Sequence, residues 1–264
     1  MEIEKGVSEE LYSVIVQLMK ADCLKDFNLG GGTNLAIRYN HRESTDIDLF
    51  SEGIVGTEKL KEISTFIKKE FKEEFKHIYE ENFGDEKMAF LRGIIERNNV
   101  LIKIDIIQNM PLLHDVDVID EIRLINEIDI GSLKLVSAAD RGTQKDFCDL
   151  LLLTQIHNLN ILHENLIERE KKFSGNAYGT IFNPEALPSG LANNLTPLGD
   201  FNKASDRSME SNRLKITKYT KLPTSWPVLS EKWVKEVETF AKLKGLSFAP
   251  TPKKRSRKSK GFKL

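Results

Sequence analysis

The sequence is poor in the features that mark secreted, disulfide-bonded or membrane-spanning proteins. Its 264 residues include only two cysteines, Cys23 and Cys148, which form no CxxC or Cys/His pattern, so neither a disulfide nor a zinc site is expected. No run of about 18 or more apolar residues is present, which argues against a membrane span. The acidic first ten residues lack the apolar stretch of a signal peptide. These absences favour a soluble cytoplasmic protein with reduced thiols.

The net charge of −1 conceals an uneven distribution of charge. Residues 250–264 contain seven lysines and arginines and no acidic residue, which leaves 32 basic against 40 acidic residues in the rest of the chain. A basic end of this kind is expected to be flexible and to bind a polyanion such as RNA through counterion release. A solvated terminus, or contact with the acidic remainder of the protein, would also explain the composition.

Residues 29–50, LGGGTNLAIRYNHRESTDIDLF, contain two patterns that suit nucleotide chemistry. Glycines 30–32 let the backbone turn tightly, and the first amides of a helix near Thr33 would attract a phosphate. Asp46 and Asp48 alternate with apolar residues, so both carboxylates leave one face of a strand with their Cα atoms about 6.6 Å apart, which suits Mg²⁺. Either pattern alone more often marks an ordinary turn or an exposed polar face. Their order and spacing together indicate a phosphate cradle followed by a metal site.

A third carboxylate, Asp105, lies in a strongly apolar segment. Residues 99–108 alternate as a strand, with Ile102 and Ile104 on one face and Lys103 and Asp105 on the other. Taken alone, Asp105 is more simply explained as a charge on an edge strand.

Residues 29–50 resemble motif I of the nucleotidyltransferase superfamily, and more narrowly the AbiEii/AbiGii-type toxin nucleotidyltransferases of abortive-infection toxin–antitoxin systems. The residues that carry this resemblance are Gly31, Gly32, Thr33, His41, Arg42, Ser44, Asp46, Asp48, Leu49 and Phe50. A second block, about a hundred residues later, is similar to a lysine-bearing helix and an Arg-x-x-x-Lys-Asp-Phe-x-Asp-Leu string of the same family. Its residues here are Lys134, Arg141, Lys145, Asp146, Phe147, Asp149 and Leu150. The resemblance covers residues 29–153, about half of the chain.

The resemblance implies an α/β (α+β) fold. A nucleotidyltransferase core, a small mixed sheet flanked by helices, is expected over residues 1–125, and a mostly helical C-terminal domain over residues 126–250. Residues 174–212 are rich in Gly, Asn, Ser and Pro and are expected to form a long loop or a linker. Residues 251–264 would follow as the basic flexible tail.

Hydrophobic periodicity predicts individual elements. Ser8, Thr57 and Ser132 are expected to cap the helices that follow them, and another helix is expected from about Thr143. Further helices are expected at 33–39 and 226–245, the latter with Trp233, Val237, Phe240 and Leu243 facing the core, and strands at 27–29, 46–50, 75–79, 87–96 and 99–108.

Roles for the first block follow from the resemblance. Asp46, Asp48 and Asp105 would hold Mg²⁺, with Asp105 either a metal ligand or the base for the attacking hydroxyl. Arg42 and Ser44 match the motif and would shape the nucleotide-binding loop. The β- and γ-phosphates would be cradled by Gly31, Gly32 and Thr33, with Thr33 acting through its hydroxyl.

In the second block, the resemblance implies that Lys134 and Lys145 contact the triphosphate. Asp146 would orient Lys145 or act as a base. Periodicity alone gives a different interpretation, in which Lys145 and Asp149 form an i,i+4 pair on a solvated helix face.

The implied function is Mg²⁺-dependent transfer of a nucleoside monophosphate from a nucleoside triphosphate to a hydroxyl, with release of pyrophosphate. The resemblance suggests an RNA acceptor, tRNA-like, in a toxin restrained by a cognate antitoxin. Two alternatives remain: a small-molecule nucleotidyltransferase of the aminoglycoside-modifying kind, and a degenerate module that only binds a nucleotide or a partner.

Overall fold

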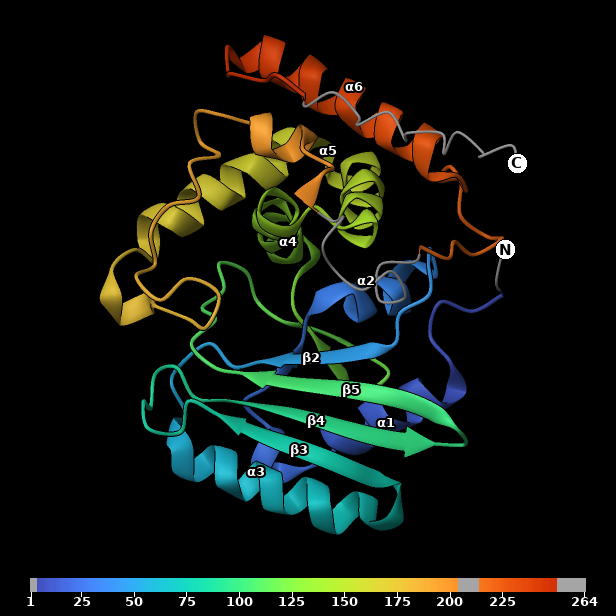
Figure 1. Ribbon diagram of the computed structural model, residues 1–264, viewed down its shortest axis with the longest axis vertical. Helices are drawn as coiled ribbons and strands as arrows, with labels where there is room; N and C mark the ends of the chain where they lie inside the picture. The colour runs from blue at the N-terminus through green and yellow to red at the C-terminus, as the bar shows by residue number, and fades with distance from the viewer. Residues whose placement is uncertain (1–3, 204–213, 251–264) are drawn as a thin grey trace, which may run out of the picture.

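The computed structural model describes residues 4–203 and 214–250, which form a mixed sheet with helices on both sides (Figure 1). The described helices are α1 (Glu9–Met19), α2 (Gly31–Tyr39), α3 (Gly56–Phe71), α4 (Glu127–Arg141), α5 (Gln144–Lys172) and α6 (Trp226–Lys244). The strands, in their order across the sheet, are β3 (Phe75–Glu81), β4 (Phe90–Arg97), β5 (Val100–Ile107), β2 (Asp46–Phe50), β1 (Asn28–Leu29), β7 (Ile122–Leu124) and β6 (Asp117–Ile119). The expected mixed α/β fold with a helical C-terminal region is confirmed.

The central strands β2 and β5 run parallel and set the geometry of the sheet. Ile47 pairs with Ile104 and Asp48 pairs with Asp105, so aliphatic residues leave one face and carboxylates leave the other. β4 pairs antiparallel with β5 and places Arg92 opposite Asp105. β1 pairs antiparallel with β2 and leads into α2.

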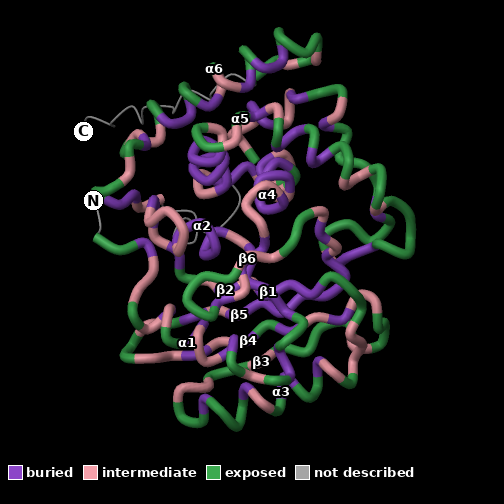
Figure 2. Tube along the Cα trace, turned by 180° about the vertical axis from the view of Figure 1, so that it is seen from behind, coloured by how far each residue is buried: buried purple, intermediate pink, exposed green. Residues whose placement is uncertain are grey.

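Two hydrophobic cores fill the two sides of the sheet. Helices α1 and α3 pack against Ile47, Ile104 and the aliphatic residues that share their face. The second core joins α2, α4, α5 and α6 to Phe50 and Ile107 on the carboxylate face. In Figure 1, α4, α5 and α6 lie beyond β2, at the opposite end of the molecule from β3. Figure 2 shows buried residues gathered in the central strands and in α4 and α5.

Local side-chain chemistry determines where the helices begin. Ser8 caps α1 as predicted and Thr143 caps α5, each accepting a hydrogen bond from the amide three residues on. The prediction for Ser132 is wrong, because the Asn126 side chain caps α4 one and a half turns earlier and leaves Ser132 buried inside the helix. Thr57 likewise lies inside α3, which begins one residue before it, at Gly56.

The loop-rich stretch after α5 is packed onto the helical core as far as residue 203. Leu191, Leu195 and Leu198 in this stretch are all buried. The indole of Trp233 in α6 donates a 2.8 Å hydrogen bond to the carbonyl of Leu198. These contacts join the stretch to α6.

Other expectations for the C-terminal region have mixed outcomes. Leu243 is 78% exposed instead of lying in the core, because the buried stripe of α6 runs through Trp233, Val237 and Phe240 and does not reach it. Residue 125, where a domain boundary was expected, lies between β7 and α4, and the division into domains stays a prediction. The remainder of the loop-rich stretch and the basic residues 251–264 lie outside the described residues. No helix of the described part of the chain is long and apolar enough to cross a membrane.

We expect Trp233→Ala to lower the free energy of unfolding by about 3–5 kcal/mol, because it leaves a cavity in the second core and removes the hydrogen bond to Leu198. Urea denaturation measures this change. The control is Val228→Ala, in the same helix but 46% exposed, which should cost less than about 0.5 kcal/mol. Equal losses in the two variants would mean that residues up to 203 do not pack on α6 as described.

Candidate active site

Three aspartates share the face of the sheet that points away from α1 and α3. Asp46 and Asp48 come from β2, and Asp105 comes from β5 directly opposite Asp48. The Cα atoms of such a pair lie about 5 Å apart, close enough for the carboxylates to face a common ion. The strand register therefore brings together the three carboxylates that the sequence indicated as neighbours.

Two cations already lie among these carboxylates. The ammonium of Lys103 is 3.2 Å from Asp105 Oδ2 and 4.0 Å from Asp46 Oδ1. The guanidinium of Arg92 holds both oxygens of Asp105, at 2.7 and 3.0 Å. Sequence reasoning assigned neither cation to the site. The position of Lys103, two residues before Asp105 on a strand, was a sufficient signal. No pattern in the sequence could have indicated Arg92, because its position opposite Asp105 depends on the pairing of β4 with β5.

The charge on Asp48 is held in an unfavourable environment. Burial raises the pKa of Asp48 to about 6, with Asp105 and Asp46 adding to the rise and Lys103 opposing it. A carboxylate that is desolvated among like charges is stabilised by any cation that binds beside it.

The carboxylates suit a hard divalent cation in their chemistry. As the side chains stand, no group of three His, Cys, Asp or Glu residues within 4–203 and 214–250 is placed to hold a metal ion. The donors are nevertheless carboxylate oxygens on adjacent strands, and Lys103 is already drawn between two of them. These residues therefore fit Mg²⁺, and metal binding by Asp46, Asp48 and Asp105 stays a prediction.

The glycine turn is shaped by two side chains of the protein itself. Gly31 has a φ of +63°, and a Cβ at this position would overlap the carboxylate of Asp48. A Cβ on Gly32 would overlap the guanidinium of Arg42. Helix α2 starts here with Gly30 as its N-cap and no capping side chain, unlike α1, α4 and α5. The positive end of α2 is thus left open to an anion beside Asp48.

The side chain of Thr33 lies in a different environment from the one expected. Its hydroxyl is buried, donates to the backbone carbonyl of Asp46 and shares a second hydrogen bond with the hydroxyl of Ser44. This hydroxyl is therefore committed to the protein and is not available to a phosphate. Both side chains fix the start of β2 against α2.

A buried ion network joins the second sequence block to the first. Asp149 of α5 accepts two hydrogen bonds from Arg42, at 2.6 and 2.7 Å, and bonds His41 Nε2 at 2.8 Å. The ammonium of Lys134 lies 2.7 Å away. Burial alone would raise the pKa of Asp149, but Arg42 and Lys134 outweigh it and hold that pKa well below its usual range. The solvated face that periodicity predicted for Asp149 is wrong, because its side chain is fully buried.

Asp146 forms the other half of this network. Its carboxylate is buried and accepts two 2.7 Å hydrogen bonds from Arg141, one of 3.1 Å from Lys134 and one of 2.5 Å from Thr143. Burial opposes its ionisation, but Lys134 and Arg141 prevail and lower the pKa of Asp146. A carboxylate so paired is a poor base, and these partners do not include Lys145. These contacts give Asp146 and Lys134 a role in joining α4 to α5. The contact of Lys134 with a triphosphate stays a prediction.

Lys145 is the expected phosphate contact that remains available. Its side chain is partly buried and makes no hydrogen bond or ion pair with the residues that the structure describes. Burial and Arg42 lower the pKa of Lys145, whereas Asp46 and Glu43 oppose that decrease. An unpaired cation thus lies within electrostatic reach of the Asp-x-Asp pair.

Backbone pairing with C-terminal residues also holds the loop that carries Arg42. The amide of Glu43 donates to the carbonyl of Lys215 at 2.9 Å, and the amide of Thr217 donates to the carbonyl of His41 at 3.1 Å. His41 is fully buried, and its Nδ1 has no hydrogen-bond partner among the described residues. The ring is therefore neutral, with Nε2–H donating to Asp149, and burial accordingly lowers the pKa of His41.

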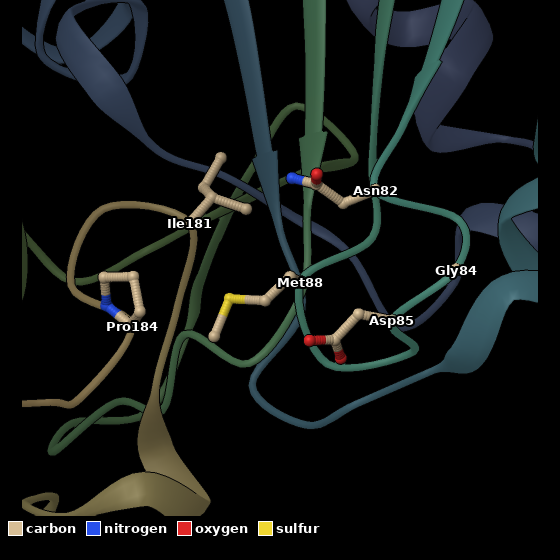
Figure 3. A pocket seen from close by; sticks show the side chains of 6 residues that line it. All are labelled: Asn82, Gly84, Asp85, Met88, Ile181 and Pro184. Atoms are coloured by element: carbon tan, nitrogen blue, oxygen red, sulfur yellow. The ribbon is translucent and has the colours of Figure 1, made fainter.

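A separate surface pocket opens where the β3–β4 connection meets the stretch after α5 (Figure 3). It has a volume of ≈ 480 Å³, and none of the expected site residues lines it. Its walls are formed by Asn82, Gly84, Asp85, Met88, Ile181 and Pro184.

Comparisons with known proteins found a matching family model and a related sequence. The family model described as nucleotidyl transferase AbiEii toxin, type IV TA system, matches residues 14–227. A protein of Aquifex aeolicus (strain VF5), described only as uncharacterized, is 26% identical over 176 residues, which cover 63% of this chain and 76% of that protein.

Two solved structures are similar in part. The nucleotidyltransferase toxin MenT4 from Mycobacterium tuberculosis H37Rv aligns with 91% of this chain and 87% of its own, at 16% identity and a TM-score of 0.49. The Megavirus polyadenylate synthase aligns with 56% of this chain and 32% of its own, at 17% identity and a TM-score of 0.36.

We expect Asp48→Asn to raise the free energy of unfolding, and to do so more at pH 8 than at pH 4. The folded-state pKa of about 6 lies above the value of about 3.9 in an unfolded chain, so ionisation of Asp48 destabilises the fold. That cost is absent below about pH 4 and develops as the pH rises through 6. After allowance for partial exposure, the gain at pH 8 should exceed that at pH 4 by about 1–2 kcal/mol in urea titrations.

The control for this experiment is Thr45→Ala, an exposed neighbour that does not titrate, whose effect should be the same at both pH values. An Asp48→Asn effect that is equally independent of pH would contradict the buried environment described for this carboxylate.

We expect Arg42→Gln to lower the free energy of unfolding by about 3–5 kcal/mol, because it leaves the buried Asp149 without its strongest partner. Lys215→Gln is the matched control, since it breaks a half-exposed pair with Glu43 in the same loop and should cost less than about 1 kcal/mol. Urea denaturation measures both. A loss of nucleotide affinity without a loss of stability would instead assign Arg42 to the nucleotide.

Proposed function

The chain belongs to the nucleotidyl transferase AbiEii toxin family of type IV toxin–antitoxin systems, and from this we propose that it transfers a nucleoside monophosphate from a nucleoside triphosphate to the terminal hydroxyl of an RNA, tRNA-like, with the help of Mg²⁺. Membership makes it a nucleotidyltransferase and implies a cognate antitoxin. The metal and the RNA acceptor belong to the proposal. The observation that carries it is the register that sets Asp48 opposite Asp105 beside the uncapped start of α2.

The triphosphate would lie at the start of α2. The backbone amides of Gly31, Gly32 and Thr33 belong to the first turn of a helix without a capping side chain, so they suit the oxygens of the β- and γ-phosphates. Lys145 adds a cation that no described residue neutralises. An ammonium in this place would stabilise the negative charge of the departing pyrophosphate.

Asp46 and Asp48 would hold Mg²⁺, with Asp105 as the third carboxylate. When bound, the metal would neutralise the phosphate oxygens and stabilise the attacking and leaving groups of the displacement. Asp48 must be ionised to serve as a ligand, and its pKa of about 6 leaves it ionised at neutral pH.

Asp105 would receive the proton of the acceptor. The acceptor oxygen forms a bond to the α-phosphorus, the bond from that phosphorus to the bridging oxygen of the β-phosphate breaks, and pyrophosphate departs with the electron pair. The proton of the hydroxyl passes to the carboxylate of Asp105. Arg92 and Lys103 now hold this carboxylate, so at least one of them must turn away before the transfer. The half-exposed tip of Arg92 has room to do so.

The remaining motif residues would position the carboxylates of β2 without contacting the substrate. Arg42, Lys134 and Asp149 hold the loop before β2 against α4 and α5. Thr33 and Ser44 fix the first residue of β2 beside α2. They would thereby align Asp46 and Asp48 with the phosphates without touching them.

We expect Asp48→Asn to reduce nucleotide transfer at least a hundredfold, because it removes a carboxylate that the reaction needs. The assay incubates the protein with labelled nucleoside triphosphates, Mg²⁺ and either total tRNA or an aminoglycoside, and it measures label in each acceptor. Glu58→Gln, on the exposed surface of α3 behind the sheet, is the control and should keep full activity.

A different result would contradict each part of the proposal. Label in the aminoglycoside alone would replace the RNA acceptor with a small molecule. Full activity of Asp48→Asn would discard the metal assignment. A calorimetric titration without any Mg²⁺-dependent binding of nucleoside triphosphate would show a degenerate nucleotide site.

A further inference from the structure

The outer part of the sheet is only partly covered on the side of the carboxylates, although Asp105 and Ile107 of β5 are buried there. Strands β4 and β5 bury their opposite side in the core beneath α1 and α3, against which Ile78 of β3 is partly buried. On the carboxylate side, Tyr79 of β3 is 45% exposed and Leu101 of β5 is 62% exposed. In Figure 1 the helices α4, α5 and α6 lie at the far end of the molecule, beyond β2. Large apolar side chains that are exposed together on one face indicate a binding surface more often than single, scattered apolar side chains do.

The strand register arranges this open face in two rows that lead into the candidate active site. In one row Tyr79 pairs with Arg92, Arg92 with Asp105, and Asp105 with Asp48. The adjacent row contains His77, Ile94, Lys103 and Asp46. Each row runs from an aromatic ring through a cation to a carboxylate, over three inter-strand spacings or about 14 Å.

The aromatic end of the rows suits unpaired bases. The rings of His77 and Tyr79 contact each other edge to face, with centroids 4.0 Å apart, and both side chains are exposed. Exposed aromatic rings on a sheet face stack with unpaired bases, and they do so with little dependence on sequence.

The middle of the rows suits a phosphate. Arg92 and Lys103 are half-exposed and reach Asp105 from two strands. A nucleic acid strand carries base, phosphate and terminal hydroxyl in the same order in which the rows present ring, cation and carboxylate. An acidic or apolar protein segment would match only a part of this order.

We propose that the open face of β3, β4 and β5 binds the single-stranded 3′ end of the acceptor RNA. A base stacks on His77 and Tyr79, a backbone phosphate contacts Arg92 and Lys103, and the terminal hydroxyl reaches Asp105. The identity of the acceptor rests on the proposed function, whereas the surface rests on the register and exposure of these strands. A phosphate that takes over Arg92 also frees Asp105, so the acceptor itself unmasks the group that receives its proton.

The test measures RNA binding apart from catalysis. The full chain carrying Asp48→Asn, without nucleoside triphosphate, is titrated into a 5′-fluorescein RNA of about eight nucleotides with a free 3′ hydroxyl, and anisotropy gives the affinity. Adding Tyr79→Ala should weaken binding roughly tenfold, whereas Tyr79→Trp should retain it because an indole also stacks. Adding Arg92→Gln should weaken binding and reduce its dependence on salt.

The matched control is Tyr219→Ala. Tyr219 is 65% exposed with the ammonium of Lys218 5.1 Å from its ring, so it is an equivalent aromatic and cationic pair outside the sheet. Its loss should leave RNA affinity unchanged. A circular dichroism spectrum and urea midpoint for each variant exclude unfolding as the cause of weaker binding.

Several results would overturn the assignment. One is equal RNA affinity with and without Tyr79→Ala, and another is a loss of affinity that also occurs with Tyr79→Trp. A third is a change in oligomeric state with RNA affinity unchanged, which would make the face a contact between copies of the chain. The two proposals also fail separately. A protein with Asp48 intact that labels no RNA, while Tyr79→Ala still weakens RNA binding, would reject the transfer reaction and keep this surface.

Discussion

The fold depends on neutralising Asp149, a carboxylate with no exposed surface. Its partners come from segments far apart in the chain: His41 and Arg42 before β2, and Lys134 in α4. A buried charge without partners costs several kcal/mol, so these segments are stable only together. The two sequence blocks, about a hundred residues apart, are therefore two halves of one ion network. Because Asp46 and Asp48 follow Arg42 closely in the chain, the same network fixes where the carboxylates of β2 lie.

The pKa values of the buried carboxylates shift in opposite directions in the ion network and on the carboxylate face of the sheet. Around Asp149 and Asp146 every carboxylate has a cationic partner, and the pKa values are lowered. On the sheet face Asp48 has no bonded partner of its own among the described residues, and its pKa is raised. The first arrangement favours ionisation of the buried carboxylates, whereas the second opposes ionisation of Asp48. Groups with perturbed pKa values of the second kind are common at functional sites.

Much of the fold was predictable because local patterns decide it, whereas the site depended on pairings that no local pattern contains. Ser8 capped its helix as expected, α5 began next to Thr143 as expected, and the alternation in β5 gave its faces correctly. Residues 146–153 of α5 are buried on all sides, so periodicity could not show that Asp149 points inward. The place of Arg92 followed from a hairpin register, and the meeting of Asp48 with Asp105 was expected only through resemblance to a known family.

The loop from His41 to Glu43 obtains two of its backbone partners from Lys215 and Thr217, which lie in the last fifth of the chain. During translation this loop cannot acquire those hydrogen bonds until residue 217 has left the ribosome. At ordinary elongation rates of about 5–20 residues per second, the interval between synthesis of the loop and of its partners is on the order of ten seconds or more. For most of its synthesis the nascent chain therefore lacks two of the backbone hydrogen bonds of this loop, and the loop can be completed only near the end of translation.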